Sequence, residues 1–244
     1  MYARTPQNVC LHEAEAGHAV LRFDEVTVTY PDGDQTVTAL DRVSFEVPRG
    51  NIAAIIGESG SGKSTLLSVA AGLSVPDSGT VTIDTGTEVV ELARATETER
   101  ARVRRNFLGV VFQRPNLLPA LTVSEQLVIA DDLSGRRHGV KKAAELLDFV
   151  GLDGMENRRV HQLSGGQQQR VNIARALMGN PRVLLADEPT SALDHKLSQE
   201  IMGLLRKVTD RFGLATVLVT HDGSLLNKTC LLYTSDAADD SPPV

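Results

Sequence analysis

The chain has 244 residues, a length that fits one large domain or two small ones. Hydrophobic residues make up 41% and charged residues 23%, a globular balance that excludes a disordered, collagen-like or coiled-coil protein. The net charge of −6 argues against a dedicated nucleic-acid binder. No apolar run approaches the roughly 18 residues of a membrane span, and no apolar core follows a basic start at the N-terminus. Cys10 and Cys230 lack the spacing of a disulfide framework or a zinc site, so we expect a soluble, cytosolic protein.

The N-terminal part of the chain alternates apolar and polar residues, which is typical of half-buried strands. The run 52–56 is instead wholly apolar, as in a strand that is buried on both faces. In chain order the sequence predicts a loose arm over residues 1–19, antiparallel strands over 21–30 and 40–47, a turn at 31–34, a buried strand over 52–56, a helix that ends near Gly72 and a strand at 81–83.

The middle of the chain, from Glu88 to about Ser164, is charged and helical in pattern, with an apolar interruption at 108–112 and a loop at 115–119. After it the sequence predicts a helix over residues 166–178, a strand over 183–186, a helix over 197–212 and a strand over 216–220. Apolar strands that alternate with helices indicate an α/β fold with a parallel sheet. We interpret residues 88–165 as a helical insertion into that sheet.

A glycine-rich loop follows the buried strand and reads GESGSGKS, which matches the pattern GxxxxGK[ST] between a strand and a helix. Its glycines let consecutive backbone N–H groups turn inward around an anion, and the helix N-terminus adds partial positive charge. Lys63 would reach the β and γ phosphates, and the Ser64 hydroxyl would bind Mg²⁺. The predicted nucleotide-binding residues of this loop are Gly57, Glu58, Ser59, Gly60, Ser61, Gly62, Lys63, Ser64 and Thr65. The loop alone does not distinguish a kinase, a GTPase, a helicase and a transporter ATPase.

Two acidic residues close the predicted strand at 183–186. The carboxyl ends of strands are where open α/β sheets bind ligands, so Asp187 can join the Mg²⁺ shell. Glu188 points differently and can accept a proton from an attacking water. On these residues alone, a plain helix start remains an alternative.

The segment 163–167 reads LSGGQ and precedes a predicted helix. Ser164 suits the N-cap, and Gly165 and Gly166 leave backbone amides free at the helix start, which makes a second anion site. An ordinary N-cap with a glycine turn is the alternative.

The phosphate loop, LSGGQ at 163–167 and LLADEPTSALD at 184–194 stand in the order that is the signature of ABC ATPases, and the chain resembles that family. The resemblance extends from about Leu21 to Asp222, some four-fifths of the chain. It implies a P-loop NTPase (RecA-like) parallel-sheet core with an antiparallel β subdomain and an inserted α-helical subdomain at about 88–165, together forming one ATPase domain over residues 20–229. It also implies ATP and Mg²⁺ as ligands.

The resemblance assigns further roles to individual residues. Tyr30 takes the place of the aromatic that stacks on adenine, and His221 that of the histidine that contacts the γ-phosphate. Gln113 matches the glutamine that contacts Mg²⁺ and the water and senses the membrane partner. Asp194 ends the loop that crosses to the other subunit, and Ser164, Gly165, Gly166 and Gln167 cover the partner's ATP. Taken alone, Tyr30 could cap a hairpin, Gln113 could be a solvated loop residue and His221 a strand-end histidine.

The family's mechanism implies a head-to-tail homodimer that drives a separate membrane permease from the cytoplasmic face of the membrane, with no nucleic acid as partner. Four stretches, 30–33, 38–40, 108–113 and 116–123, resemble the lipoprotein-release and macrolide-export type of ATP-binding subunit, with a cell-division ATPase of the same branch as a close alternative. A soluble ABC ATPase that acts on DNA or ribosomes is a further alternative, but such proteins usually carry long coiled-coil insertions or two cassettes. An inactive cassette is disfavoured because every catalytic position is filled.

The basic run Arg100–Arg105 is interpreted as a solvated helix face, since no aromatic residues interleave with it.

The last segment of the sequence, CLLYTSDAADD at 230–240, back-translates without forcing to a transposon-end sequencing adaptor read in frame. We therefore expect residues 230–244 to be an artefactual tail on an ATPase that is truncated after the predicted His221 strand. Removing this segment, which has three Asp and no Lys or Arg, would change the net charge from −6 to −3. A natural polar tail is the alternative.

Overall fold

The computed structural model describes residues 19–33, 35–133, 135, 139–226 and the strand at 231–234. The predicted N-terminal arm therefore lies outside the described residues except for Ala19. The predicted tail also lies outside them except for residues 231–234. In the part of the chain that is described, no helix is long and apolar enough to cross a membrane.

The N-terminal strands form an antiparallel sheet of order β2-β1-β4-β5. Its strands are β1 (Ala19–Asp32), β2 (Gln35–Pro48), β4 (Ser78–Asp84) and β5 (Val89–Glu91). The predicted pairing of the first two strands is confirmed, with Phe23 opposite Phe45 and their rings stacked at a centroid distance of 4.6 Å. The alternation of apolar and polar residues buries one face of this sheet.

The second sheet is parallel and has the order β6-β7-β8-β3-β9. Its strands are β3 (Ile52–Ile56), β6 (Leu108–Val111), β7 (Val183–Asp187), β8 (Ala215–Thr220) and β9 (Leu231–Thr234). Because all five strands run in one direction, their carboxyl ends meet at one edge, and the segments that follow them are brought together there.

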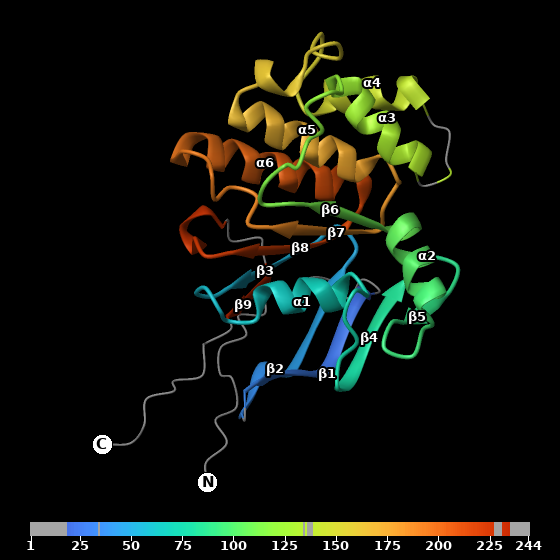
Figure 1. The fold of residues 1–244 in the computed structure, drawn as a ribbon, viewed down its shortest axis with the longest axis vertical. Coiled ribbons are helices and arrows are strands. Elements are labelled where there is room, and N and C mark those ends of the chain that lie inside the picture. The colour runs from blue at the N-terminus through green and yellow to red at the C-terminus, as the bar shows by residue number, and fades with distance from the viewer. Residues whose placement is uncertain (1–18, 34, 134, 136–138, 227–230, 235–244) are drawn as a thin grey trace.

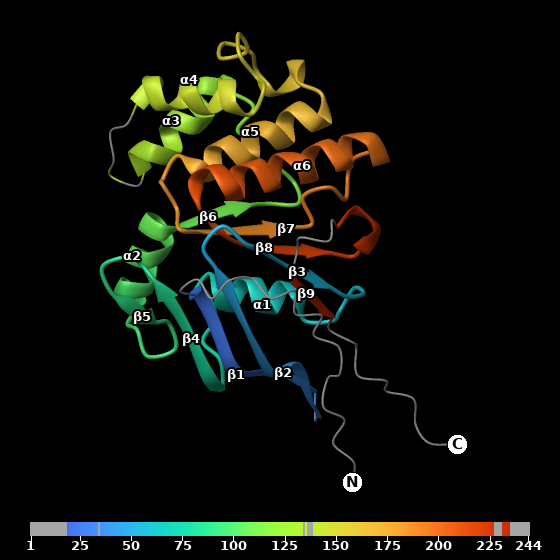
Figure 2. The same ribbon diagram turned by 180° about the vertical axis from the view of Figure 1, so that it is seen from behind.

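Helices cover both faces of the parallel sheet (Figures 1 and 2). The helices are α1 (Lys63–Ala70), α2 (Glu97–Phe107), α3 (Val123–Leu133), α4 (Gly139–Phe149), α5 (Gly165–Leu177) and α6 (His195–Phe212), with short 3₁₀ turns η1 (Val160–Gln162) and η2 (Gly223–Leu225). Ala53 and Ile55 of β3 pack into a core with α1 and the antiparallel sheet. Ile52 and Ala54 point the other way, into a core with α3, α4, α5 and α6. The predicted core with an antiparallel subdomain and a helical subdomain is confirmed.

The helical insertion is smaller than the range 88–165 that the sequence suggested. Strand β5 pairs with β4 of the antiparallel sheet, and Val103 of α2 belongs to the same core as that sheet. The apolar interruption at 108–112 contains β6, which pairs with β7 of the parallel sheet. Strands this short show no clear period, so only their partners identify them. Residues 231–234, assigned to the tail, form β9 and pair with β3.

Candidate nucleotide-binding site

The glycine-rich loop at 57–62 connects the end of β3 to α1. Lys63, the first residue of α1, is 7% exposed, and its Nζ donates to the carbonyl oxygens of Gly57 at 2.7 Å and Glu58 at 2.5 Å. Gly62 is the N-cap of α1, and no side chain caps the helix. The amides of the first turn therefore lack helical partners and face the loop, which suits an anion.

Gly62 also allows the phosphate loop to pack closely against β2 of the antiparallel sheet. Its φ of 83° is left-handed, and a Cβ at this position would lie 2.1 Å from the carbonyl oxygen of Ala39 on β2. Only glycine fits both conditions. Two residues before Ala39, Val37 pairs with Tyr30 of β1, so the predicted aromatic residue lies on the hairpin that contacts the loop. Tyr30 is 44% exposed, and its stacking on adenine stays a prediction.

An unsatisfied hydroxyl within the loop supports phosphate as the ligand. Ser61 Oγ is buried and is one of two side-chain atoms in the described residues that are buried without a hydrogen-bond partner. Such atoms are rare and costly in folded proteins. Gly60 has a φ of 89°, and a Cβ there would meet nothing within 4 Å. A phosphate oxygen would give Ser61 and the free amides an acceptor, so these residues fit a bound phosphate.

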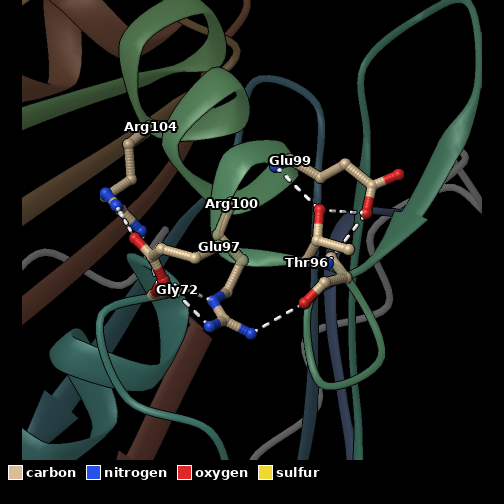
Figure 3. Close-up of polar contacts among 7 residues, drawn as sticks. Gly72, Thr96, Glu97, Glu99, Arg100 and Arg104 are labelled. Atoms are coloured by element: carbon tan, nitrogen blue, oxygen red, sulfur yellow. Dashed lines mark hydrogen bonds and ion pairs between the residues drawn. The ribbon is translucent and has the colours of Figure 1, made fainter.

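Helix α2 anchors the opposite end of α1 (Figure 3). Arg104 donates to the carbonyl oxygen of Gly72 at 2.7 Å, and Glu97 accepts from Arg104 at 2.5 Å and from Arg100 at 2.9 Å. Hydrogen bonds from Arg104 and then Arg100 lower the pKa of the Glu97 carboxyl below its ordinary value. The side chain of Arg100 is 15% exposed and that of Arg104 is 25% exposed, because α2 packs on the end of α1. The interpretation of Arg100–Arg105 as a solvated helix face is therefore wrong for these two arginines.

Asp187 and Glu188 lie at the end of β7, beside the phosphate loop. Burial, and then the charge of Glu188, raise the pKa of the Asp187 carboxyl, while the nearby Lys63 ammonium opposes that rise. Glu188 has a left-handed φ of 40°, and its N–H donates to the carbonyl oxygen of Val219 on β8 at 2.9 Å. A non-glycine residue in this region is uncommon and is found at functional sites. The strand ends here, and α6 begins only at His195, which excludes a direct helix start.

His221 follows β8 and meets Glu188 at the same edge of the sheet. His221 Nδ1 lies 3.1 Å from Glu188 Oε2. The two residues are 33 positions apart in the sequence, and the adjacency of β7 and β8 brings them together. The structure therefore joins the predicted acid and the predicted histidine in one hydrogen bond.

Of the three predicted Mg²⁺ ligands, Ser64, Gln113 and Asp187, Asp187 alone has a side chain that can carry a negative charge. Ser64 is exposed and Asp187 is half-buried, and no group of three or more His, Cys, Asp or Glu residues able to hold a metal occurs among the described residues. This donor set fits Mg²⁺, which is bound through one or two carboxylates and substrate phosphates and keeps its waters. Gln113 follows β6, next to β7, but its exposed side chain makes no hydrogen bond to the described residues. Its role toward the metal stays a prediction.

The segment at 164–167 begins α5 and forms a reciprocal cap. Ser164 Oγ accepts from the N–H of Gln167 at 3.3 Å, and Gln167 Oε1 accepts from the N–H of Ser164 at 2.9 Å. The predicted N-cap is thus confirmed. A Cβ on Gly166 would approach Leu197 of α6 to 3.2 Å, so this segment packs on α6. In the described part of the chain no hydrogen bond joins it to the phosphate loop, so the structure does not bring these two predicted half-sites together.

Asp194 has a structural role that was not predicted. Its Oδ1 accepts from the N–H of Leu197 at 2.9 Å, so Asp194 is the N-cap of α6. The signal was in the sequence, since Asp is a preferred N-cap and directly precedes the helix. The cap explains why α6 begins at His195 rather than at the predicted 197. Asp194 is exposed, as is Ser164, which leaves both open to a partner.

Four buried or half-buried polar residues that were not predicted hold the loop at 112–121. Gln126 of α3 exchanges hydrogen bonds with Leu118, at 3.1 Å to its N–H and 2.6 Å to its carbonyl oxygen. Gln169, Asn172 and Arg175 of α5 bind the first half of the loop. Burial lowers the pKa of the Arg175 guanidinium. The only signal in the sequence was polar residues at three-residue spacing on an otherwise apolar helix face.

A protein-family model described as ABC transporter matches residues 40–191. Among curated proteins, the chain is 42% identical over 205 residues to the methionine import ATP-binding protein MetN 2 of Rhodococcus jostii, covering 83% of this chain and 59% of that protein. It is 41% identical over 213 residues to the methionine import ATP-binding protein MetN of Geobacillus kaustophilus, covering 86% of this chain and 61% of that protein. The chain thus spans about three fifths of the length of these curated relatives.

Two solved structures resemble the fold and share sequence with it. One, entitled "Dimeric Structure of MJ0796, a Bacterial ABC Transporter Cassette", is 36% identical, with a TM-score of 0.75 over 88% of this chain and 94% of that chain. The other is described as the dimeric post-hydrolysis state of the same cassette bound to ADP and Pi. It is 39% identical, with a TM-score of 0.72 over 84% of this chain and 89% of that chain.

Proposed function

Since this chain belongs to the ABC transporter family, we propose that it is an ATP-binding cassette that binds ATP with Mg²⁺ and hydrolyses it to drive a separate membrane permease. One observation carries the proposal: β3, β7 and β8 are adjacent and end at one edge of the sheet. That edge holds Lys63, Glu188 and His221, which are a phosphate ligand, a base and its hydrogen-bond partner.

In the proposed mechanism the protein positions groups and stabilises charge, as in phosphoryl transfer generally. The amides at the start of α1 and the Lys63 ammonium bind the phosphates. Lys63 exchanges its bonds to the loop carbonyls for phosphate oxygens, and the freed loop widens around the nucleotide. Asp187 and Ser64 would hold Mg²⁺, which supplies neutralisation of phosphate charge when bound. Glu188 orients and deprotonates the attacking water, and His221 holds the Glu188 carboxylate in place.

Hydrolysis is proposed to take place in a head-to-tail homodimer. Among the described residues, no hydrogen bond joins Ser164, Gln167 or Asp194 to the phosphate loop of their own chain, and Ser164 and Asp194 are exposed. A similar cassette is described as dimeric in a state bound to ADP and Pi. A second copy would bring this surface over the nucleotide, so each site is made of two chains.

The test of this function is phosphate release from ATP by the purified full chain, with Glu188→Gln as the matched variant. The variant keeps the size of the side chain but cannot act as a base, so we expect ATP binding without turnover. Gel filtration with light scattering should then show that Mg²⁺ and ATP convert Glu188→Gln from monomer to dimer. Wild-type turnover in the variant would refute the role of Glu188, and a variant that binds ATP only as a monomer would refute the shared site.

The transported substrate is proposed from the relatives. Two of them are named as methionine import ATP-binding proteins, which favours methionine import over the lipoprotein-release and macrolide-export type that the sequence stretches suggested. The permease is proposed to hold the cassette at the cytoplasmic face of the membrane. Uptake of labelled methionine into vesicles that contain the cassette and the permease encoded beside it tests import. Release of a lipoprotein from the same vesicles, without methionine uptake, would support the export type instead.

A further inference from the structure

Helix α5 carries a row of three polar side chains along one face. Gln169, Asn172 and Arg175 are three residues apart, a spacing that places them side by side on a helix. Gln169 is 2% exposed and Asn172 is fully buried, while Arg175 is half-buried. The three also bind one another: Asn172 Nδ2 donates to Gln169 Oε1 at 3.3 Å, and Arg175 donates to Asn172 Oδ1 at 3.1 Å.

The row points its remaining donors at the backbone of the loop that contains Gln113. Gln169 and Asn172 both donate to the carbonyl oxygen of Phe112, at 3.3 Å and 2.9 Å. Arg175 donates to the carbonyl oxygen of Pro115 at 2.6 Å and to that of Asn116 at 3.3 Å. The residues on both sides of Gln113 are therefore held from α5, while the side chain of Gln113 is exposed and makes no hydrogen bond among the described residues.

We propose that Asn172 and Arg175 are positioning residues that place Gln113 at the nucleotide edge of the sheet. The inference rests on the proposed function, because it gives Gln113 a task there. Residue 112 follows the end of β6, which lies beside β7 and Asp187. Apart from the row, the hydrogen bonds that side chains of the described residues donate to or accept from the loop after β6 come from Gln126 at Leu118 and Leu121 and from Arg159 at Ala120, all at its far end.

Arginine at position 175 suits this role for a physical reason. Its planar guanidinium donates in several directions at once, so one side chain binds two loop carbonyls and Asn172. Buried charged groups without partners are costly, so the guanidinium is bound to these acceptors rather than left free. A lysine at this position would supply one compact ammonium and could not span the same set. Arg175→Met would leave the carbonyls of Pro115 and Asn116 without these partners and would let the loop move.

The test compares Arg175→Met and Arg175→Lys with Arg170→Met, a matched control on the same helix. Arg170 also donates to a backbone carbonyl, that of Val150 at 2.8 Å, and pairs with Glu200, but within the described part of the chain it makes no hydrogen bond to residues 112–121. The first readout is amide hydrogen exchange in the nucleotide-free full chain, which needs no activity. Exchange of residues 112–121 should rise in Arg175→Met, rise less in Arg175→Lys and stay at the wild-type level in Arg170→Met.

The second readout is ATP hydrolysis as a function of Mg²⁺ concentration. Because misplacement of a catalytic group by about 1 Å can cost up to a hundredfold in rate, kcat should fall about tenfold to a hundredfold in Arg175→Met. The Mg²⁺ concentration at half-maximal rate should rise, while affinity for a fluorescent ATP analogue without Mg²⁺ stays unchanged.

Equal exchange over 112–121 in Arg175→Met and Arg170→Met would overturn the proposal. If the wild type does not hydrolyse ATP, the proposed function fails, and the exchange comparison still decides whether the row holds the loop. If Arg175→Met does not fold, Arg175→Lys decides the same comparison.

Discussion

Replacing Glu188 by asparagine should make the nucleotide-free protein more stable while abolishing hydrolysis. Glu188 has a φ of 40°, in the left-handed region. An ordinary L-residue loses about 1–2 kcal/mol there, whereas asparagine is among the residues that adopt it routinely. The contact of Glu188 with His221 is lost in the variant, but His221 is 57% exposed, and exposed pairs contribute little. We therefore expect a net gain of about 1 kcal/mol, which corresponds to a rise in Tm of about 2–4 °C in a protein of this size.

Glu188→Gln separates strain from charge in this experiment. Both variants remove the negative charge beside Asp187, so both remove the same repulsion. Only asparagine relieves the backbone. The difference in Tm between the two variants therefore measures the strain. Arg42→Asn is a control because Arg42 on β2 is exposed, has a φ of 44° and pairs with the exposed Asp41 at 3.5 Å.

The assay is thermal unfolding followed by circular dichroism in the absence of nucleotide, with phosphate release measured on the same samples. Glu188→Asn should melt above Glu188→Gln, and Arg42→Asn should melt above the wild type. An asparagine variant that melts at or below the glutamine variant would refute the claim that the native protein holds Glu188 in a strained conformation. The strain would then be absent or compensated by neighbours.

Three further predictions concern the same edge of the sheet. Lys63→Met should weaken ATP binding by about tenfold to a hundredfold, the loss expected for charge-assisted hydrogen bonds of about 1.5–3 kcal/mol, as measured by titration with a fluorescent analogue. Unchanged affinity would contradict the assignment of the loop. Asp187→Asn should raise Tm at pH 7, because a raised carboxyl pKa means that the folded state disfavours the ionised form. That gain should shrink as the pH falls toward the ordinary value of 3.8 and vanish below it, where Asp187 is protonated in both states; a gain that is constant with pH would contradict it. Gly62→Ala should lower both Tm and ATP affinity, because its Cβ would meet the Ala39 carbonyl at 2.1 Å. Gly154→Ala, with a left-handed φ of 73° but open space around it, should lower Tm through backbone strain alone and leave ATP affinity unchanged.

The sequence predicted those elements whose signal is local. Strand β3 was placed at its observed bounds, 52–56, because a strand buried on both faces is apolar at every position. The phosphate loop and the acids at 187 and 188 were also found, since each is a short motif joined to such a strand. Strands β5 and β6 were not separated from the helical region, because three or four residues carry no period and acquire their identity only from β4 and β7.

The parts of the site that escaped prediction depend on contacts between distant residues. Asn172 and Arg175 bind carbonyl groups that lie 60 residues earlier in the chain. A backbone carbonyl has no side-chain signature, so its partner cannot be read from the residue type. Arg104 likewise binds the carbonyl of Gly72, 32 residues before it, and only the packing of α2 on α1 distinguishes it from a solvated arginine.

The strand order also determines when the nucleotide loop can form during synthesis. Strand β3 lies between β8 and β9, so it pairs with segments that are translated about 160 residues later. At typical rates of 5–20 residues per second, that interval lasts roughly 10–30 s. During this time an all-apolar strand has no sheet to join, and its open edges can pair with other chains. A nascent chain that has emerged only as far as α5 thus contains the whole phosphate loop but lacks the strands that β3 pairs with, so the sheet that holds the loop is incomplete until β8 arrives.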